Sequence, residues 1–394
     1  MRVLVLGAGL QGSACAFDLL NSATVEQVRI ADVRTGDLPP FLQRFLGGDN
    51  ARLVPVALDV RDADAVRLAF ADGDAVCSAI PYYFNFPLAA LAVEAGVHFC
   101  DLGGNTEIVR QQMTLDAAAK AARVSVVPDT GLAPGMVNII AQHGINQFDQ
   151  VESVRLYVGG LPQQPEPPLN YQIAYSIEGM VDYYTSESLV VRNGQLTGVR
   201  ALSELEPVRF EEPVGELEAF HTAGGLSTMV YRYADTIPTM EYKTLRYPGH
   251  ARIMESIRDL DLLSTEPVDV KGQQVVPRDV FVRVAGQKLH KRKPDLVALR
   301  VVVEGTRNGV RATRAWQLVD RYDATNGITA MMRTTGYTLS ITAQLQVQGV
   351  VPPGVHTPDE CIPPERYFAM LAERGVHVRE ITPGEGRGGR ERDG

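Results

Sequence analysis

The first residues of the chain have the spacing of a dinucleotide-binding turn. Apolar residues 3–6 lead into Gly7-Ala8-Gly9-Leu10-Gln11-Gly12, and Asp32 follows twenty residues after Gly12. In a G-x-G-x-x-G turn the first glycine permits the tight bend, the second lets the backbone approach a pyrophosphate, and the third lets a helix pack on the strand. That helix directs its N-terminus at the phosphates, and the later acid binds the ribose hydroxyls. We therefore predict a Rossmann nucleotide site; the alternative is a glycine-rich turn in another α/β fold.

The predicted cofactor is NAD, with NADP left open. A carboxylate at Asp32 repels the 2′-phosphate of NADP, and Arg34, two residues on, partly offsets that repulsion. The predicted cofactor-binding residues are Gly7, Gly9, Leu10, Gln11, Gly12, Asp32, Asp59, Val60, Ile80 and Pro81.

Polar side chains follow the strands expected in the second half of a parallel sheet. Residues 78–83 end one such strand and residues 100–105 end the next. Ligands of open α/β sheets bind beyond the carboxyl ends of the strands, so the nicotinamide is expected there. We predict Asp101 and Tyr82 as catalytic residues, against a helix cap or turn for Asp101 and ordinary packing for Tyr82. For Asp129, after the following strand, capping of the next helix is favoured over catalysis.

A second polar segment, Glu241 to His250, contains the predicted substrate-binding residues Lys243, Arg246 and Tyr247. Lys243 and Arg246 are three residues apart, which suits one face of a helix or a tight turn. Arginine binds a carboxylate through two parallel hydrogen bonds, which lysine cannot reproduce; the alternative is a surface ion pair. For His250, packing is favoured over general-base catalysis. Because His, Cys, Asp and Glu show no metal-ligand spacing, we predict no metal.

The elements that must position these residues predict an α/β fold with two domains. Strands and helices alternate to about residue 130, as in a doubly wound parallel Rossmann sheet. The expected strands are 53–58, 75–80, 98–102 and 124–128, and the expected helices are 87–95 and 108–122. Beyond residue 150, turns at 192–194 and 307–309 predict hairpins of an α+β substrate and dimerisation domain with an antiparallel sheet. Helical periodicity resumes from 334 to 345. The predicted domains are 1–140, 141–330, helices of 331–383 that return to the Rossmann domain, and a disordered tail, 384–394.

Composition excludes several classes of partner. With a net charge of −9 over 394 residues, the chain is a poor match for nucleic acid or an anionic membrane, and the basic run 288–293 is favoured as a solvated loop. No apolar stretch is long enough for a membrane span. Cys15, Cys77, Cys100 and Cys361 lack C-x-x-C spacing, which favours reduced thiols in a cytoplasmic protein. Chain size and expected strand edges favour a homodimer or homotetramer.

Several segments together resemble the saccharopine dehydrogenase family, most closely its lysine 6-dehydrogenase branch. They are 7–12, 78–82, 100–105, 131–138, 159–162, 168–171, 243–250 and 331–337. The resemblance implies a Rossmann domain interrupted by an α+β catalytic domain, with C-terminal helices returning to the first. It implies amino-acid oxidoreduction at a C–N bond, with Asp101 and Tyr82 near the active site and Arg246 at the position of the substrate-carboxylate arginine.

The predicted reaction is oxidative deamination of the ε-amine of L-lysine, a small amino-acid substrate, to a semialdehyde that cyclises. Asp101 would stabilise the developing iminium, Tyr82 would relay a proton, and Arg246 would hold the distant carboxylate. This mechanism requires Asp101 and Arg246 to share one cavity. Three alternatives are a saccharopine dehydrogenase or reductase, a carboxynorspermidine-type dehydrogenase and a non-catalytic dinucleotide sensor.

Overall fold

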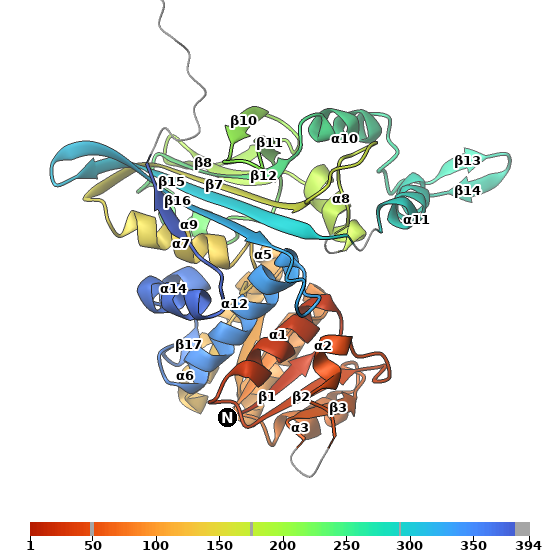
Figure 1. The fold of residues 1–394 in the computed structure, drawn as a ribbon, viewed down its shortest axis with the longest axis vertical. Coiled ribbons are helices and arrows are strands. Elements are labelled where there is room, and N and C mark those ends of the chain that lie inside the picture. Colours follow the sequence, from red (N-terminus) through yellow and green to blue (C-terminus); the bar gives the residue numbers. More distant parts are fainter. Residues whose placement is uncertain (48–50, 174–175, 291–292, 383–394) are drawn as a thin grey trace, which may run out of the picture. The chain divides into compact units, whose positions relative to one another are not determined.

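The computed structural model describes residues 1–47, 51–173, 176–290 and 293–382. The predicted tail, 384–394, lies outside these residues, as does part of the basic run. The chain divides into two units (Figure 1). The first comprises residues 1–143, 227–229 and 323–377, and the second comprises the remainder. Each unit is described below by itself.

The first unit is built around a seven-stranded parallel sheet with strand order β17-β6-β5-β4-β1-β2-β3. Strand order reverses between β1 and β4, which is where open α/β sheets bind ligands. The elements are β1 (Arg2–Leu6), α1 (Leu10–Asn21), β2 (Gln27–Asp32), α2 (Pro40–Gln43), β3 (Leu53–Ala57), α3 (Ala63–Phe70), β4 (Ala75–Ser78), the 3-10 turn η1 (Tyr82–Phe84), α4 (Asn85–Ala95), β5 (His98–Asp101), α5 (Thr106–Met113), α6 (Asp116–Ala122), β6 (Ser125–Val127), α7 (Met136–Ile145), α12 (Ala330–Val347), β17 (Gly354–Val355), α13 (Pro358–Cys361) and α14 (Pro364–Glu373).

Both faces of this sheet are buried, so its strands are almost continuously apolar. Leu4, Val76 and Phe99 belong to a core cluster that also contains residues of α3, α4 and α6. On the neighbouring strands, Cys77 and Cys100 point the other way; the thiol of Cys100 lies 3.8 Å from the carbonyl oxygen of Leu339 in α12. All four cysteines are free and buried.

The returning helix α12 packs closely on α1. A Cβ added at Gly336 would lie 2.7 Å from the Cβ of Ala14 and 2.8 Å from the carbonyl oxygen of Gln11. Only glycine permits this approach, which explains Gly336 within the predicted helix 334–345. The predicted helix 108–122 is instead two helices, α5 and α6. After α14 the chain forms β18 (Arg379–Ile381), a strand in the sheet of the second unit.

The second unit contains a nine-stranded mixed sheet. Its main path is β10-β11-β12-β7-β15-β16-β18, and β8 pairs with β12 and β9. All pairs are antiparallel except β12 with β7, so the predicted antiparallel sheet is confirmed with one parallel exception. The elements are β7 (Gln150–Pro162), α8 (Ile177–Thr185), β8 (Ser188–Arg192), β9 (Gln195–Val199), β10 (Glu206–Arg209), β11 (Glu216–His221), α9 (Met229–Tyr233), β12 (Thr239–Arg246), α10 (His250–Asp259), β13 (Val268–Val270), β14 (Gln273–Val275), α11 (Pro277–Leu289), β15 (Asp295–Arg307), β16 (Val310–Arg321) and β18.

Both hairpins predicted from Asn-Gly turns are present. Asn193 and Asn308 have φ of 52° each, and each is followed by a glycine with positive φ, as tight hairpin turns require. These turns join β8 to β9 and β15 to β16. Within the described residues, no helix has the length and apolar content needed to cross a membrane.

Candidate functional site

The glycine turn after β1 has the shape of a phosphate cradle. Gly7 has φ of +96°, and a Cβ there would lie 2.8 Å from the carbonyl oxygen of Ala79 and 2.9 Å from Cγ2 of Ile80. A Cβ at Gly12 would overlap the carbonyl oxygen of Gly7, whereas a Cβ at Gly9 would meet nothing within 4 Å. The turn is therefore closed by the two residues that follow β4 and open at Gly9, where a pyrophosphate would approach.

The N-terminus of α1 lacks a side-chain cap. Gly9 is its N-cap, and no side chain accepts a hydrogen bond from the first turn. Uncapped amide groups at the positive end of a helix dipole favour a bound phosphate. Beside them, the buried Oε1 atom of Gln11 has no hydrogen-bond partner among the described residues. The glycine turn, the uncapped N-terminus of α1 and the unsatisfied amide oxygen of Gln11 together fit a bound dinucleotide.

Asp32 ends β2 beside this turn. One oxygen of its carboxylate accepts from the backbone N–H of Ala8 at 2.9 Å, and the other accepts from the N–H of Arg34 at 3.1 Å. These bonds hold the carboxylate at the rim of the cradle. Two further predicted cofactor contacts, Asp59 and Val60, follow β3; Asp59 is paired with Arg61 at 2.6 Å, which lowers the pKa of its carboxyl group. Pro81, next to Ile80, is exposed.

Asp101 is fully buried at the end of β5, and its carboxylate is held in place. Oδ1 accepts from the N–H of Gly103 at 2.7 Å, and Oδ2 accepts from Nε2 of Gln112 at 2.7 Å. Burial raises the pKa of Asp101 to about 6, although both hydrogen bonds lower it. Asn105 caps α5, so Asp101 does not. Asp101 is thus the last residue of β5, and its pKa of about 6 lies well above that of an ordinary aspartate.

Asp129 does not cap a helix, contrary to the interpretation favoured from sequence. It follows β6 with φ of +61°, and α7 begins only at Met136. Its Oδ2 accepts a hydrogen bond from the hydroxyl of Ser227, and its buried Oδ1 has no partner among the described residues. Burial, together with the nearby charges of Asp101 and Asp359, raises the pKa of Asp129 to about 8, although the hydrogen bond from Ser227 lowers it.

Tyr82, Asp101 and Asp129 meet around two glycines, and we call these three residues the strand-end cluster. A Cβ at Gly103 would overlap the carboxylate of Asp129, and a Cβ at Gly104 would lie 3.4 Å from the ring of Tyr82. Both glycines have positive φ. The loop after β5 thus brings together the two predicted catalytic residues and Asp129, although a catalytic role for each stays a prediction.

Two supporting residues of this cluster were missed from sequence. Gln112 lies on the buried face of α5, where its position relative to Asp101 follows a helical pattern but carries no motif. Ser227 belongs to a short segment, 227–229, that is far from the rest of the first unit in sequence but folds with it. No local signal identifies such a partner, because only the tertiary fold brings it to Asp129.

The raised pKa of Asp129 predicts a pH-dependent stability. An ordinary aspartate has a pKa near 3.8, so the folded protein holds this proton more tightly than the unfolded chain does. The contribution is fully present below about pH 4 and is lost as the pH rises through about 8. We expect melting temperatures between about pH 5 and pH 9 to fall by several degrees more in the wild type than in Asp129→Asn. Parallel curves for the two proteins would contradict this assignment.

In the second unit, Arg246 lies on a strand rather than on a helix or in a turn. It is the last residue of β12, so Lys243, three positions earlier, points to the opposite face. The prediction that both side chains share one face is therefore wrong. The guanidinium of Arg246 is buried and stacks 4.7 Å from the ring of Tyr171. It donates to the hydroxyl of Tyr184 at 3.2 Å and to the carbonyl oxygen of Leu245 at 2.8 Å.

His250 is packed and hydrogen-bonded within this arrangement, as favoured from sequence. Its Nε2 lies 3.0 Å from the hydroxyl of Tyr184, and its Nδ1 lies 3.0 Å from the carbonyl oxygen of Leu169. Burial, and then the charge of Arg246, lower the pKa of His250 to about 3. A neutral, fully packed imidazole orients Tyr184, which in turn contacts Arg246.

The other two predicted substrate residues are engaged within the protein. Lys243 is buried and donates to Glu206 at 2.9 Å and to the carbonyl oxygen of Glu204 at 2.8 Å. The hydroxyl of Tyr247 donates to the carbonyl oxygen of Pro162 at 3.0 Å. Of the three residues predicted to bind substrate, Arg246 has the aromatic and hydrogen-bonded surroundings that suit a carboxylate-binding guanidinium.

Comparison with known proteins matches two family models along the chain. Residues 3–127 match the family model of the saccharopine dehydrogenase NADP binding domain, and residues 131–376 match that of the saccharopine dehydrogenase C-terminal domain. The chain belongs to the saccharopine dehydrogenase family. The family resemblance predicted from sequence is thereby confirmed, whereas its narrower form, the lysine 6-dehydrogenase branch, stays a prediction.

Two curated family relatives are distant and longer than this chain. A saccharopine dehydrogenase (NADP(+), L-glutamate-forming) of Pyricularia oryzae is 26% identical over 229 residues, which cover 54% of this chain and 48% of that protein. A mitochondrial alpha-aminoadipic semialdehyde synthase of Bos taurus is 24% identical over 276 residues, which cover 67% of this chain and 29% of that protein. The matches therefore span about half or less of these relatives.

Solved structures support the fold. The apo saccharopine dehydrogenase (L-Glu forming) of Saccharomyces cerevisiae has a TM-score of 0.79 at 19% identity, and the match covers 97% of this chain and 100% of that one. The homospermidine synthase of Legionella pneumophila, solved with NAD, has a TM-score of 0.66 at 10% identity, with coverage of 99% and 94%. At these identities the likeness concerns the fold alone.

Three residues of the second unit are of the types that bind metal ions, but nearby arginines make them part of an ion-pair network. Glu204, His221 and Glu241 place ligand atoms within 4.8 Å of one another. Arg192 pairs with Glu204 at 2.8 Å and with Glu241 at 2.6 Å, and Arg155 approaches Glu241 at 3.4 Å. Two guanidiniums already compensate these carboxylates, so the group does not fit a divalent cation.

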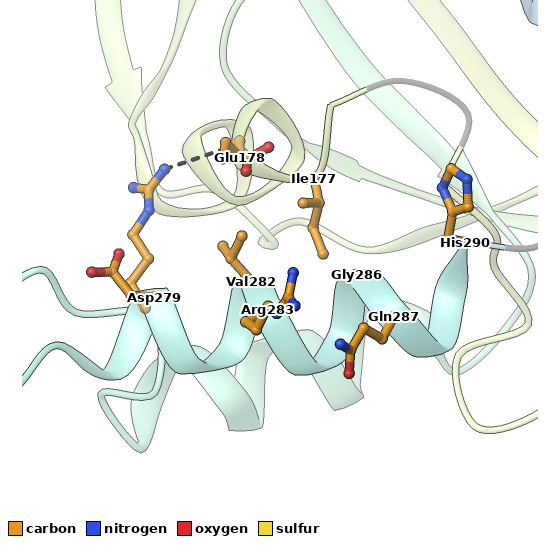
Figure 2. Close-up of a pocket in the computed structure, with 9 residues that line it drawn as sticks. Ile177, Glu178, Asp279, Val282, Arg283, Gly286, Gln287 and His290 are labelled. Atoms are coloured by element: carbon orange, nitrogen blue, oxygen red, sulfur yellow. Dashed lines mark hydrogen bonds between the residues drawn. The ribbon is translucent and has the colours of Figure 1, made fainter.

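A groove between α8 and α11 is separate from the predicted substrate residues. Figure 2 shows Ile177 of α8 pointing toward α11 and Val282 of α11 pointing toward α8, while Arg278 donates to the carbonyl oxygen of Glu178 at 3.3 Å. Its other lining residues are Asp279, Arg283, Gly286, Gln287 and His290. Arg246, Lys243 and Tyr247 do not line it, so we assign this groove no part in the reaction.

Proposed function

We propose that this protein is an NAD(P)-dependent oxidoreductase that acts on the C–N bond of a saccharopine-type secondary amine. The observation that carries the proposal is the strand-end cluster, which lies at the carboxyl ends of strands next to the dinucleotide cradle in a chain of this family. Oxidative deamination of lysine, the function favoured from sequence, becomes the second candidate. One curated relative and one solved structure reported above are named saccharopine dehydrogenases, which supports placing the secondary amine first.

The proposed reaction develops positive charge at the substrate nitrogen, and this charge must be stabilised. The carbon next to the amine loses a hydride, for which a bound NAD(P)+ would be the acceptor. Positive charge then develops on the C=N bond, water adds to that carbon, and the C–N bond breaks to release an amino acid and an aldehyde. A carboxylate at Asp101 stabilises this positive charge more strongly than it stabilises the neutral amine, which lowers the barrier. Tyr82, whose ring rests on Gly104, is placed to orient the water or relay a proton.

Arg246 supplies the specificity in this proposal. Saccharopine is a secondary amine that carries carboxylates at both ends, and lysine carries one carboxylate. A guanidinium held by Tyr171, Tyr184 and the backbone of β12 is pre-oriented for such a group. Asp101 and Arg246 belong to different units, and we propose a role in the reaction for each of them.

Product analysis distinguishes the candidates. Saccharopine with NAD(P)+ should yield NAD(P)H, an amino acid and an aldehyde, whereas lysine with NAD(P)+ should yield NAD(P)H and ammonia. Turnover of saccharopine alone supports the first candidate, and turnover of lysine alone replaces it with the second. Oxidation of carboxynorspermidine would assign the third candidate, and tight dinucleotide binding without turnover of any amine would indicate a sensor.

Cofactor choice depends on Asp32, and we propose NAD, although the matched family model is named for NADP. Asp32 repels a 2′-phosphate, and the backbone bond to Ala8 keeps its carboxylate at the turn. We expect Asp32→Ser to shift the ratio of NADH to NADPH affinity by about tenfold toward NADPH. Fluorescence titration measures both affinities; Asp62→Ser, in the cap of α3, is the control. A wild-type preference for NADPH would overturn this part of the proposal.

The expected homodimer or homotetramer also stays a proposal. Val268 and Val270 of β13, with Val280 and Val284 of α11, are about half exposed, and all four lie in the second unit. Large exposed apolar patches mark interaction sites, and these four side chains are candidates for such a site. Sedimentation of the full chain measures its oligomeric state.

A further inference from the structure

We propose that a groove in the first unit, between α1, α12 and α14, binds a small organic anion that carries carboxylate or phosphate groups. The groove is separate from the strand-end cluster and from the glycine turn, and the proposed reaction makes no use of it. Its lining combines arginines, side-chain amides and hydroxyls. The proposal rests on how the charges within this lining are paired.

Four guanidiniums line the groove, against three carboxyl groups. The arginines are Arg44, Arg333, Arg366 and Arg374, and the acids are Asp18, Asp323 and Glu373. Asp18 is buried and committed to Arg374, at 2.7 Å, and to the hydroxyl of Ser340, at 2.6 Å. This pair lines the groove, and its hydrogen bond fixes the position of one guanidinium.

Two of the arginines have no carboxylate partner among the described residues. The guanidinium of Arg44 stacks 5.1 Å from the ring of Phe17 and 4.9 Å from the ring of Phe45. The guanidinium of Arg366 donates to the amide oxygen of Gln348. Aromatic stacking and an amide acceptor hold each cation without neutralising it, which leaves both available for an oxyanion.

The motif 331–337 contributes to the same groove. Arg333 and Tyr337 are one helical turn apart on α12, and the guanidinium of Arg333 lies 5.5 Å from the Tyr337 ring. Arg333 also donates to the carbonyl oxygen of Arg374 at 3.1 Å. Gly336, which lies between them in the sequence, allows α12 to pack closely on α1. The groove thus explains two polar residues of a motif that the dinucleotide and substrate sites leave without a role.

The charge of the groove, compared with that of the whole chain, indicates which class of ligand the groove would bind. The chain as a whole carries a net charge of −9, so a groove with an excess of arginine is a local exception that attracts small anions, while the remaining surface repels polyanions. The amide NH2 group of Gln348, whose oxygen accepts from Arg366, lines the same groove and suits the oxygen atoms of a metabolite. A polycarboxylate and a phosphate ester share this chemistry.

Calorimetric titration of the full chain tests the proposal with citrate and with inorganic phosphate, at an ionic strength matched with sodium chloride. We expect at least one probe to bind, and Arg44→Gln/Arg366→Gln to weaken its binding about tenfold or more. Binding of citrate alone indicates a polycarboxylate ligand, and binding of phosphate alone indicates a phosphate ester. Because the readout is binding, it is independent of the amine that the protein oxidises.

The matched control is Arg67→Gln/Arg110→Gln, which removes two exposed arginines of the same unit that are paired with Asp64 and Glu107. This variant should bind the probe as the wild type does. Arg44 and Arg366 are exposed, so their replacement should leave the melting temperature in plain buffer unchanged. Failure of both probes to bind, equal binding by the Arg44/Arg366 variant, or equal weakening by the control overturns the proposal.

Discussion

Replacing Arg246 with alanine is expected to lower kcat/KM for the amine substrate by about a hundredfold or more, while the affinity for the dinucleotide is retained. A charged hydrogen bond in a buried site contributes about 1.5–3 kcal/mol, and a carboxylate bound by arginine makes two of them. The loss should be large because Arg246 is buried and is held in one orientation by Tyr171, Tyr184 and the carbonyl oxygen of Leu245. Steady-state kinetics with the amine measures the effect.

Two further variants test whether the loss of activity is specific to the guanidinium of Arg246. Arg246→Lys keeps the charge but loses the paired donors, so it should restore only a small part of the activity. Arg300→Ala removes another guanidinium of the same sheet, which stacks 4.4 Å from Phe210 and donates to Gln317. Near-normal kinetics are expected for Arg300→Ala. Near-normal kinetics for Arg246→Ala in a folded protein would remove Arg246 from the substrate site.

Asp101→Asn is expected to reduce turnover by about 10²- to 10³-fold without weakening dinucleotide binding. The carboxylate is the form that stabilises positive charge, and its pKa is raised to about 6. The wild-type kcat/KM should therefore rise with pH through about 6 and then level off, and the variant should lack this rise. Continuous assays of NAD(P)H formation across this range measure it.

The substitution is suited to the site because the fold can accommodate it. Gln112 now donates Nε2 to the carboxylate, and its buried Oε1 has no partner among the described residues. After rotation of its amide, Gln112 can accept from the new Asn side chain, so the buried pair stays satisfied. Asp64→Asn, an exposed acid of α3, is the control. An unchanged pH profile in Asp101→Asn would refute the electrostatic role of Asp101.

Local sequence patterns were sufficient for the elements that surround the cofactor turn. Gly7 and Gly12 determine a turn that other residues cannot form, Gly9 leaves it open, and the uncapped start of α1 follows directly from it. The Asn-Gly turns likewise determined two hairpins, because their positive φ angles are encoded by adjacent residues. These features depend on interactions between residues close in sequence, where composition and spacing carry most of the information.

The tertiary structure alone decided what surrounds the polar side chains. Lys243 and Arg246 looked like neighbours at helical spacing, but pairing of β12 with β7 and β11 makes the segment a strand and separates them to opposite faces. Asp129 looked like a helix cap, but Ser227, about a hundred residues later, donates to its carboxylate and burial raises its pKa. The pKa of a side chain depends on desolvation and on charges from distant segments. The sequence therefore determined which side chains could react. The tertiary structure decided their protonation and the face to which each one points.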